Sequence, residues 1–153
     1  MSKPVITVFG ATGAQGGSLA RALLRDPQRS FRVRAVTRRP GGNAARMLAE
    51  QGAEIFAADL GDAPSVRHAM RGAHGAFCIT NYWELLSPER ELEQADTLAQ
   101  AAWHEGVRHV VWSTLEDTRA FVVADGPRMP VLAGGCNEPH HHGHGYADRV
   151  FVA

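Results

Sequence analysis

The chain has 153 residues, of which 44% are hydrophobic and 21% charged. This length and composition fit one globular domain and exclude disorder, collagen-like repeats or a long coiled coil as the main architecture. No apolar stretch approaches the roughly eighteen residues that a transmembrane helix needs, so we expect no membrane partner. The start of the sequence lacks the apolar region of a signal peptide, and two cysteines are too few for a disulfide framework. We therefore expect a cytoplasmic protein.

The formal net charge is zero, but the charges are unevenly distributed. Residues 1–50 hold nine basic and two acidic residues, which gives this part +7 and the remainder −7. A basic half indicates either nucleic acid or a small ligand that carries phosphate. The arginines are scattered over predicted strands, helices and turns with no nucleic-acid-reading motif, and this disfavours nucleic acid.

Short runs rich in β-branched and aromatic residues alternate along the chain with segments of helical periodicity. The predicted strands cover residues 5–9, 31–36, 54–58, 75–80 and 107–113. The predicted helices cover residues 18–25, 43–51 with Asn43 as the N-cap, a short segment capped by Asp62, and 88–105 capped by Ser87. Strands that alternate with helices predict an α/β fold, a doubly wound parallel sheet of about five strands with helices on both faces.

A glycine-rich turn connects the first predicted strand to the first predicted helix. Its pattern is GxxGxxG, formed by Gly10, Ala11, Thr12, Gly13, Ala14, Gln15 and Gly16. Gly10 permits a tight turn, Gly13 lets a pyrophosphate approach the backbone, and Gly16 lets helix and strand pack closely. Exposed N–H groups at the helix start would then bind the anion. The context of strand, turn and helix favours a dinucleotide site over a turn without a ligand.

The residues after the second and third predicted strands indicate which dinucleotide would bind. The second strand is followed by Arg38 and Arg39 in place of the acid that often contacts a ribose 2′-OH. Arg38 could pair with a 2′-phosphate, which favours NADP over NAD, although solvated surface arginines would give the same pattern. Asp59 and Leu60, at the end of the third strand, are placed to contact an adenine edge and its ring. Residues 1–117 are therefore expected to form a dinucleotide-binding domain.

With these residues identified, the chain resembles the NmrA-like family, an atypical branch of the short-chain dehydrogenase/reductase superfamily. The resemblance rests on five segments: VFGATGAQGGSLARALL (8–24), VRAVTRRP (33–40), QGAEIFAADLGD (51–62), ITNYWE (79–84) and VVWSTLED (110–117). It implies an NADP-binding Rossmann fold. It also implies cofactor contacts from residues 10–15, from Arg38 and the loop after it, from Asp59 and Leu60, and from Thr80, Asn81 and Tyr82.

The sequence departs from the catalytic members of that superfamily. Those enzymes use a Tyr-x-x-x-Lys pair, whereas the only lysine here is Lys3. Ser113 takes the place where the superfamily's serine often lies, but without those partners we do not assign it a catalytic role. In relatives the lysine of a Pro-His-Phe-Asp-Gly-Lys-Gly segment reaches toward the cofactor. His144 falls on that position, and the resemblance implies that it contacts the cofactor by donating a hydrogen bond. The resemblance also implies a smaller C-terminal lobe, which we expect to be missing here.

Residues 118–153 are expected to form an irregular, histidine-rich tail of the same domain, with a short final helix over residues 146–152. His140, His141, His142 and His144 follow Cys136 closely, and such side chains can bind transition metals. Adjacent residues of an extended segment point in different directions, so we favour a solvated loop and expect no metal site.

Three functions remain open on this basis. The first is an NADP(H)-binding regulatory or redox-sensing protein with a protein partner, which the absence of the Tyr-x-x-x-Lys pair favours over an enzyme. The second is an NADP-dependent oxidoreductase that reduces quinones or small carbonyl compounds. The third is a truncated homologue with impaired function. Apolar surface on the fifth strand and the last helix leads us to expect a homodimer or poor solubility.

Overall fold

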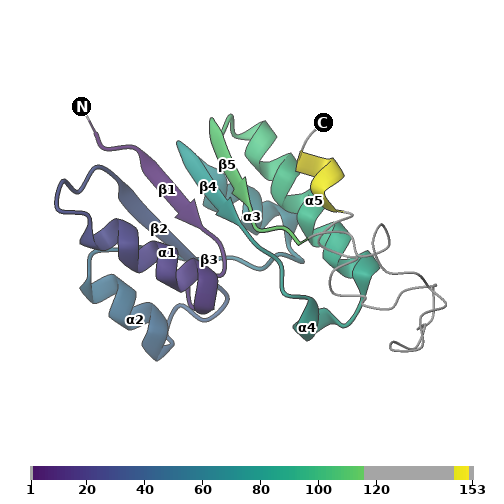
Figure 1. Ribbon diagram of the computed structural model, residues 1–153, viewed down its shortest axis with the longest axis horizontal. Coiled ribbons are helices and arrows are strands. Elements are labelled where there is room, and N and C mark those ends of the chain that lie inside the picture. The colour runs from purple at the N-terminus through teal and green to yellow at the C-terminus, as the bar shows by residue number, and fades with distance from the viewer. Residues whose placement is uncertain (1, 116–146, 152–153) are drawn as a thin grey trace.

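The computed structural model describes residues 2–115 and 147–151. Its elements, in chain order, are β1 (Val5–Val8), α1 (Ala14–Arg25), β2 (Arg32–Thr37), α2 (Asn43–Glu50), β3 (Glu54–Ala57), α3 (Ala63–Met70), β4 (Gly75–Cys78), α4 (Tyr82–Leu85), α5 (Pro88–His104) and β5 (His109–Trp112). Residues 147–151 are helical. The strands form one layer between helices on both sides (Figure 1).

All strand pairs of the five-stranded sheet are parallel, and the strand order is β3-β2-β1-β4-β5. The predicted Rossmann-like α/β fold is therefore confirmed. The chain moves outward from β1 through β2 to β3, then crosses back to β4 on the other side of β1. This reversal creates a crevice outside the carboxyl ends of β1 and β4, where ligands of such sheets bind.

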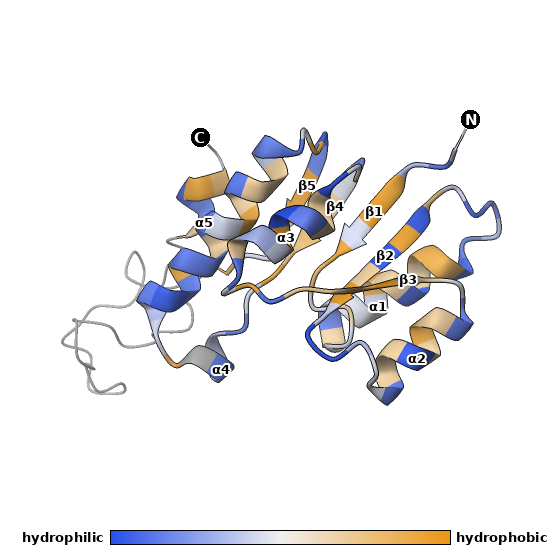
Figure 2. Ribbon diagram, turned by 180° about the vertical axis from the view of Figure 1, so that it is seen from behind, coloured by the Kyte–Doolittle hydropathy of each residue, from blue (hydrophilic) through white to orange (hydrophobic). Residues whose placement is uncertain are grey.

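The alternation of side chains along the strands builds two cores. Val33 and Ala35 of β2 belong to the core covered by α1 and α2, whereas Val36 belongs to the core covered by α3 and α5. Successive strand residues point to opposite faces, so a strand buried on both sides is apolar at both sets of positions. In Figure 2, β1 is mostly apolar in colour, whereas hydrophilic and apolar colours alternate along β2, whose sequence is RVRAVT.

Three local expectations need correction. Helix α1 begins at Ala14, four residues before the predicted start, because close packing on the sheet places the poor helix formers Gly16 and Gly17 inside the helix. The N-cap of α2 is Gly42, so Asn43 is the first helical residue. The sequence also gave no indication of α4, a helix of four residues between β4 and α5.

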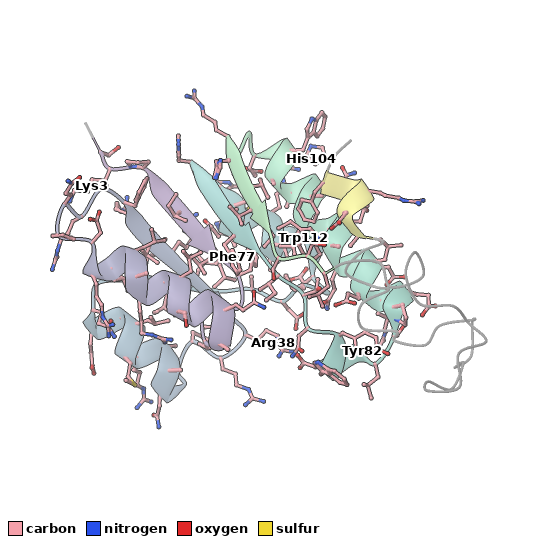
Figure 3. The ribbon with its side chains drawn as sticks, viewed as in Figure 1. Lys3, Arg38, Phe77, Tyr82, His104 and Trp112 are labelled. Atoms are coloured by element: carbon pink, nitrogen blue, oxygen red, sulfur yellow. The ribbon has the colours of Figure 1, made fainter. Side chains whose placement is uncertain are left out.

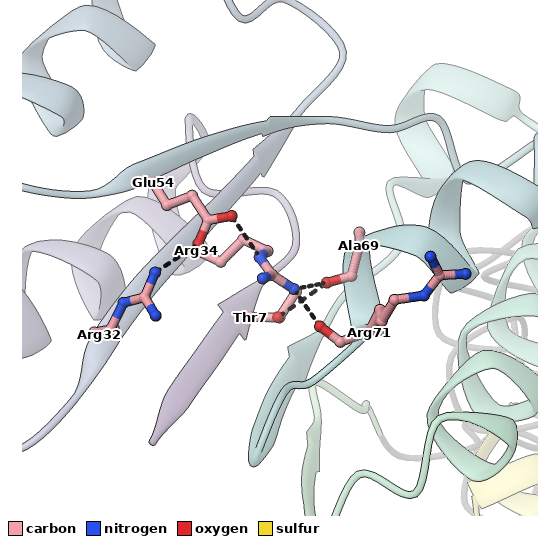
Figure 4. A network of polar contacts seen from close by, with 6 residues as sticks. All are labelled: Thr7, Arg32, Arg34, Glu54, Ala69 and Arg71. Atoms are coloured by element: carbon pink, nitrogen blue, oxygen red, sulfur yellow. Dashed lines mark hydrogen bonds and ion pairs between the residues drawn. The ribbon is translucent and has the colours of Figure 1, made fainter. Parts of the chain in front are cut away.

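A partly buried arginine connects three elements at the α3 side of the sheet. Arg34 donates from Nε to Glu54 of β3 at 3.1 Å and from Nη1 to the carbonyls of Ala69 and Arg71 at 2.8 Å each. The hydroxyl of Thr7 donates to the same Ala69 carbonyl at 3.2 Å (Figure 4). The last carbonyls of α3 have no partner within the helix, so these donors from β1 and β2 fix its end against the sheet.

Within the part of the chain that the structure describes, no helix is long and apolar enough to cross a membrane. Cys136, the histidine cluster of residues 140–144 and most of the predicted tail lie outside the described residues. The expected role of His144 therefore stays a prediction.

Candidate functional site

The glycine loop lies at the carboxyl end of β1 and adopts the geometry that its pattern predicted. Gly10 has a φ of +62°, a value that favours glycine. A Cβ at Gly16 would lie 2.5 Å from the Gly10 carbonyl oxygen and 2.6 Å from that of Phe9, so only glycine fits there without a backbone shift. At Gly13 the nearest atom to such a Cβ is the Gly10 oxygen at 3.3 Å. Gly16 thus serves the packing of helix on strand, whereas Gly13 faces the open side of the loop.

Helix α1 presents bare amides at this loop. Its N-cap is Gly13, which has no side chain to accept from the first turn, and that turn contains no acidic residue. Gly13, Ala14 and Gln15 are exposed. The first N–H groups of a helix have no acceptor within it, and the helix dipole makes this end positive. The loop is therefore suited to an anion such as a pyrophosphate.

Thr80, Asn81 and Tyr82 follow β4 on the other side of the crevice. The Thr80 hydroxyl donates to the buried Glu91 carboxylate of α5 at 2.8 Å, so this side chain is directed into the protein. Tyr82 is also buried, with its ring edge-on to Trp83, whereas Asn81 is exposed. Of the three residues, Asn81 is the one whose side chain is open to a ligand.

A polar bridge crosses the sheet edge from β5 to the glycine loop. The Ser113 hydroxyl donates to Oε1 of Gln15 at 2.8 Å, and the Ser113 amide donates to the Cys78 carbonyl at 2.9 Å. Ser113 therefore lies beside the loop, as the position of the superfamily's serine suggested, and helps to orient Gln15. The sequence contains nothing that predicts this contact between residues 98 positions apart.

The residues expected to contact the adenosine half of a dinucleotide differ in their exposure and in their contacts. Asp59 is exposed, and its Oδ1 accepts from the Gly61 amide at 2.8 Å, while Leu60 packs against the core under α3 and α5. Arg39 is exposed, with its amide donating to the Thr37 hydroxyl at 3.1 Å. That hydroxyl lies 3.5 Å from the Thr12 hydroxyl, which joins the end of β2 to the glycine loop.

Arg38 has a partner that the sequence analysis missed. Its two terminal nitrogens donate to the two carboxylate oxygens of Glu84 in α4, at 2.6 and 2.8 Å. These hydrogen bonds raise the pKa of Arg38, and the charge of Asp59 adds to the effect. A segment that reads NYWE gives no indication that its acid meets an arginine 46 residues earlier, because only the sheet order brings the ends of β2 and β4 together.

The sole lysine of the sequence lies at the opposite edge of the molecule. Lys3 precedes β1, at the amino ends of the strands, whereas Tyr82 follows β4 at the carboxyl ends (Figure 3). The two residues cannot act together as a proton-donating pair. Among the described residues, no group of three or more His, Cys, Asp or Glu side chains is arranged to hold a metal ion.

Most of the chain is similar in sequence to known proteins. The model of the NmrA-like family matches residues 2–134. The chain is 41% identical over 114 residues to the NmrA-like family domain-containing oxidoreductase FrzB of Cladobotryum sp., covering 72% of this chain and 33% of that protein. It is 39% identical over 139 residues to the oxidoreductase himF of Aspergillus japonicus, covering 88% of this chain and 38% of that protein. The matched part of the chain thus spans between 33% and 38% of the length of these curated relatives.

Solved structures share the fold. NmrA, a negative transcriptional regulator, superposes with a TM-score of 0.77 at 25% identity, over 99% of this chain and 42% of that chain. NmrA in complex with NADP gives a TM-score of 0.72 at 26% identity, over 98% of this chain and 43% of that one. A triphenylmethane reductase from Citrobacter sp., solved with NADP(H), has a TM-score of 0.72 at 21% identity, which shows likeness of fold alone.

Proposed function

The chain belongs to the NmrA-like family, and from this premise we propose that it binds a nicotinamide dinucleotide across the crevice at the carboxyl ends of its strands. The observation that carries the proposal is the start of α1, where bare amides and glycine backbone face the crevice without a capping side chain. The NmrA structure solved with NADP, at 26% identity, supports the same ligand class.

The described residues fit such a group at three places. The amides of Ala14 and Gln15 would hold the pyrophosphate, because they lie at the positive end of α1, whereas the Gly13 amide donates to the Gly10 carbonyl at 2.9 Å. The end of β3, with Asp59, and the end of β2, with Arg38, would flank the adenosine half. Asn81 would flank the nicotinamide half. When bound, the cofactor supplies hydride transfer, and these residues hold and orient it.

We further propose that the cofactor is NADP(H) in preference to NAD(H). Arg38 lies at the end of β2, where the ribose 2′ position is read in this fold, and it is half exposed. Its guanidinium fork is suited to two parallel hydrogen bonds with a phosphate. The sequence supplies no acid directly after β2 to accept from a 2′-hydroxyl in its place.

For the role of this binding we propose redox sensing, with a protein partner that reads the cofactor-bound form. The argument is the position of Lys3, which leaves the crevice without the lysine that supports a proton-donating tyrosine. The second candidate is an NADP-dependent oxidoreductase, favoured by the names of the curated relatives FrzB and himF. The test is to incubate the protein with NADPH and a panel of quinones and small carbonyl compounds and to follow the absorbance of NADPH. A sensor should leave the absorbance constant, whereas oxidation of NADPH that depends on a substrate would establish the enzyme.

Calorimetric titration with NADP and with NAD tests the binding site. We expect NADP to bind more tightly, and we expect Gly13→Val to abolish binding of both, because the added side chain would occupy the face where the pyrophosphate lies. Arg38→Ala should weaken NADP binding roughly tenfold or more while sparing NAD. Equal losses for the two cofactors would contradict the role of Arg38, and no binding by the unchanged protein would establish the impaired homologue.

A further inference from the structure

The ion pair between Arg38 and Glu84 uses the edge of the guanidinium that a phosphate would use. Nη1 and Nη2 of Arg38 each donate to a different oxygen of Glu84, at 2.6 and 2.8 Å. A bidentate pairing of this kind is also how arginine binds phosphate. A 2′-phosphate that approached Arg38 end-on would therefore meet a site whose donors are already used.

The location of the pair makes it accessible to exchange. The Arg38 and Glu84 side chains are 52% and 43% exposed, so water can hydrate either partner when the pair opens. An exposed pair contributes little to stability, and a dianionic phosphate attracts a guanidinium more strongly than a carboxylate does. Replacement of Glu84 by a phosphate therefore costs the protein little.

From these contacts we propose that Glu84 is a specificity-determining residue, an internal anion that holds Arg38 until a 2′-phosphate takes its place. The inference rests on the proposed function, since it assumes that the adenosine half of a dinucleotide lies beside Arg38. NAD has no group that competes for the guanidinium and leaves the pair closed. NADP opens it, and Glu84 lowers the affinity for NADP by the free energy of the pair it breaks.

Opening of the pair also releases α4. This helix has four residues, and Glu84 is its tie to the end of β2. The neighbouring Trp83 is 69% exposed and packs edge-on against Tyr82, with ring centroids 5.7 Å apart. A 2′-phosphate thus changes the surroundings of an exposed tryptophan, and a nucleotide without one does not.

Glu84→Gln tests the proposal, because glutamine keeps the shape and removes the charge. The probes are NADP and NAD, together with adenosine 2′,5′-bisphosphate and AMP, which need only the adenosine part of the site. We expect the variant to bind NADP and the bisphosphate roughly two- to fivefold more tightly, the range that an exposed ion pair provides. Binding of NAD and AMP should stay unchanged.

The matched control is Glu105→Gln. Glu105 also pairs with an arginine, Arg67, at 2.6 Å, but it follows the end of α5 at the far edge of the sheet. This variant should leave all four affinities unchanged. The second readout is tryptophan emission, which the bisphosphate should shift and AMP should not, with the shift lost in Trp83→Phe.

The outcomes separate the two proposals. If neither protein binds any of the probes, both proposals fail. If the unchanged protein binds dinucleotides and Glu84→Gln alters all four affinities equally or none, dinucleotide binding stands and the role of Glu84 is overturned. Emission that the bisphosphate leaves unshifted would overturn the release of α4.

Discussion

Gly13 and Gly16 stand three residues apart in one loop, but a methyl group would meet different surroundings at each. At Gly16 it would lie 2.5 and 2.6 Å from two backbone oxygens, which cannot yield as a flexible side chain can. At Gly13 it would lie 3.3 Å from one oxygen and otherwise face the crevice. One glycine is therefore required by the fold, and the other is required by the ligand we propose.

This difference predicts that the same substitution lowers stability at Gly16 and dinucleotide affinity at Gly13. Gly16→Ala should lower the free energy of unfolding by about 1–3 kcal/mol, because the inserted methyl overpacks the contact of α1 with the β1 end. Gly13→Ala should change it by less than about 1 kcal/mol while weakening dinucleotide binding. Urea unfolding followed by circular dichroism measures both. Similar losses of stability in the two variants would contradict the separate roles.

The Cys78 thiol shows how burial alone controls the chemistry of a side chain. Cys78 is 0% exposed in the core under α3 and α5, and this burial raises the pKa of its thiol from 9.0 to about 12. The folded protein therefore keeps the thiol protonated where the unfolded chain ionises. Above about pH 9 the unfolded state loses this proton first, so the free energy of unfolding should fall as the pH rises from 9 toward 12.

The same burial predicts an inert thiol. In a Cys136→Ser variant, which leaves Cys78 as the only cysteine, alkylation by iodoacetamide should be at least about 100-fold slower in the native protein than in urea, because reaction requires opening of the core. Mass spectrometry of timed samples gives both rates. Comparable rates would show that the thiol is reachable in the folded state.

Arg34 connects β2, β3 and the end of α3 with one side chain. Its side chain is 13% exposed, and its guanidinium carbon lies 5.5 Å from the centre of the Phe56 ring. Since the carbonyls of Ala69 and Arg71 both accept from it, its removal would leave the end of α3 without these donors. Arg32, on the same strand, also pairs with Glu54, at 3.5 Å, but is 57% exposed.

The two arginines therefore form a matched pair of substitutions. Arg34→Met should lower the free energy of unfolding by about 1.5–3 kcal/mol, because hydrogen bonds from a charged donor are lost, one of them to the carbonyl of buried Ala69. Arg32→Met should change it by less than about 1 kcal/mol, as is usual for an exposed ion pair. Thermal and urea unfolding of both variants test this, and equal effects would show that burial is not the cause.

The β5 edge of the sheet carries exposed apolar surface. Within the described ranges, β5 pairs with β4 alone, and its Val111 side chain is 46% exposed. Trp103, near the end of α5, is 77% exposed. An apolar edge strand with unpaired backbone groups is prone to pairing with another chain.

We therefore expect the protein to self-associate through this edge. Sedimentation velocity over a range of concentrations should show a monomer–dimer equilibrium, and Val111→Lys should shift it toward monomer, because a charge on an edge strand opposes pairing. Ser18→Lys, an exposed change on α1, serves as the control. A single monomeric species at all concentrations would contradict the expectation.

Features that depend on local chemistry can be predicted from the amino-acid sequence. Alternating apolar runs specified β1 to β5, and the glycine spacing specified a turn with Gly10 at positive φ. Ser87 and Pro88 specified the start of α5, where the Ser87 hydroxyl accepts from the Arg90 amide at 3.3 Å. These features follow from the conformational preferences of residues that are close in sequence, so a short segment of the chain is enough to predict them.

Which distant residues meet at the crevice depends on the order of strands in the folded protein. The tertiary structure paired Arg38 with Glu84, placed Ser113 against Gln15 and turned Thr80 toward buried Glu91. Each contact joins groups whose distance depends on the order of strands in the sheet, and no local pattern encodes that order. The glycine loop could therefore be predicted as an anion site, whereas the carboxylate that already occupies Arg38 could not.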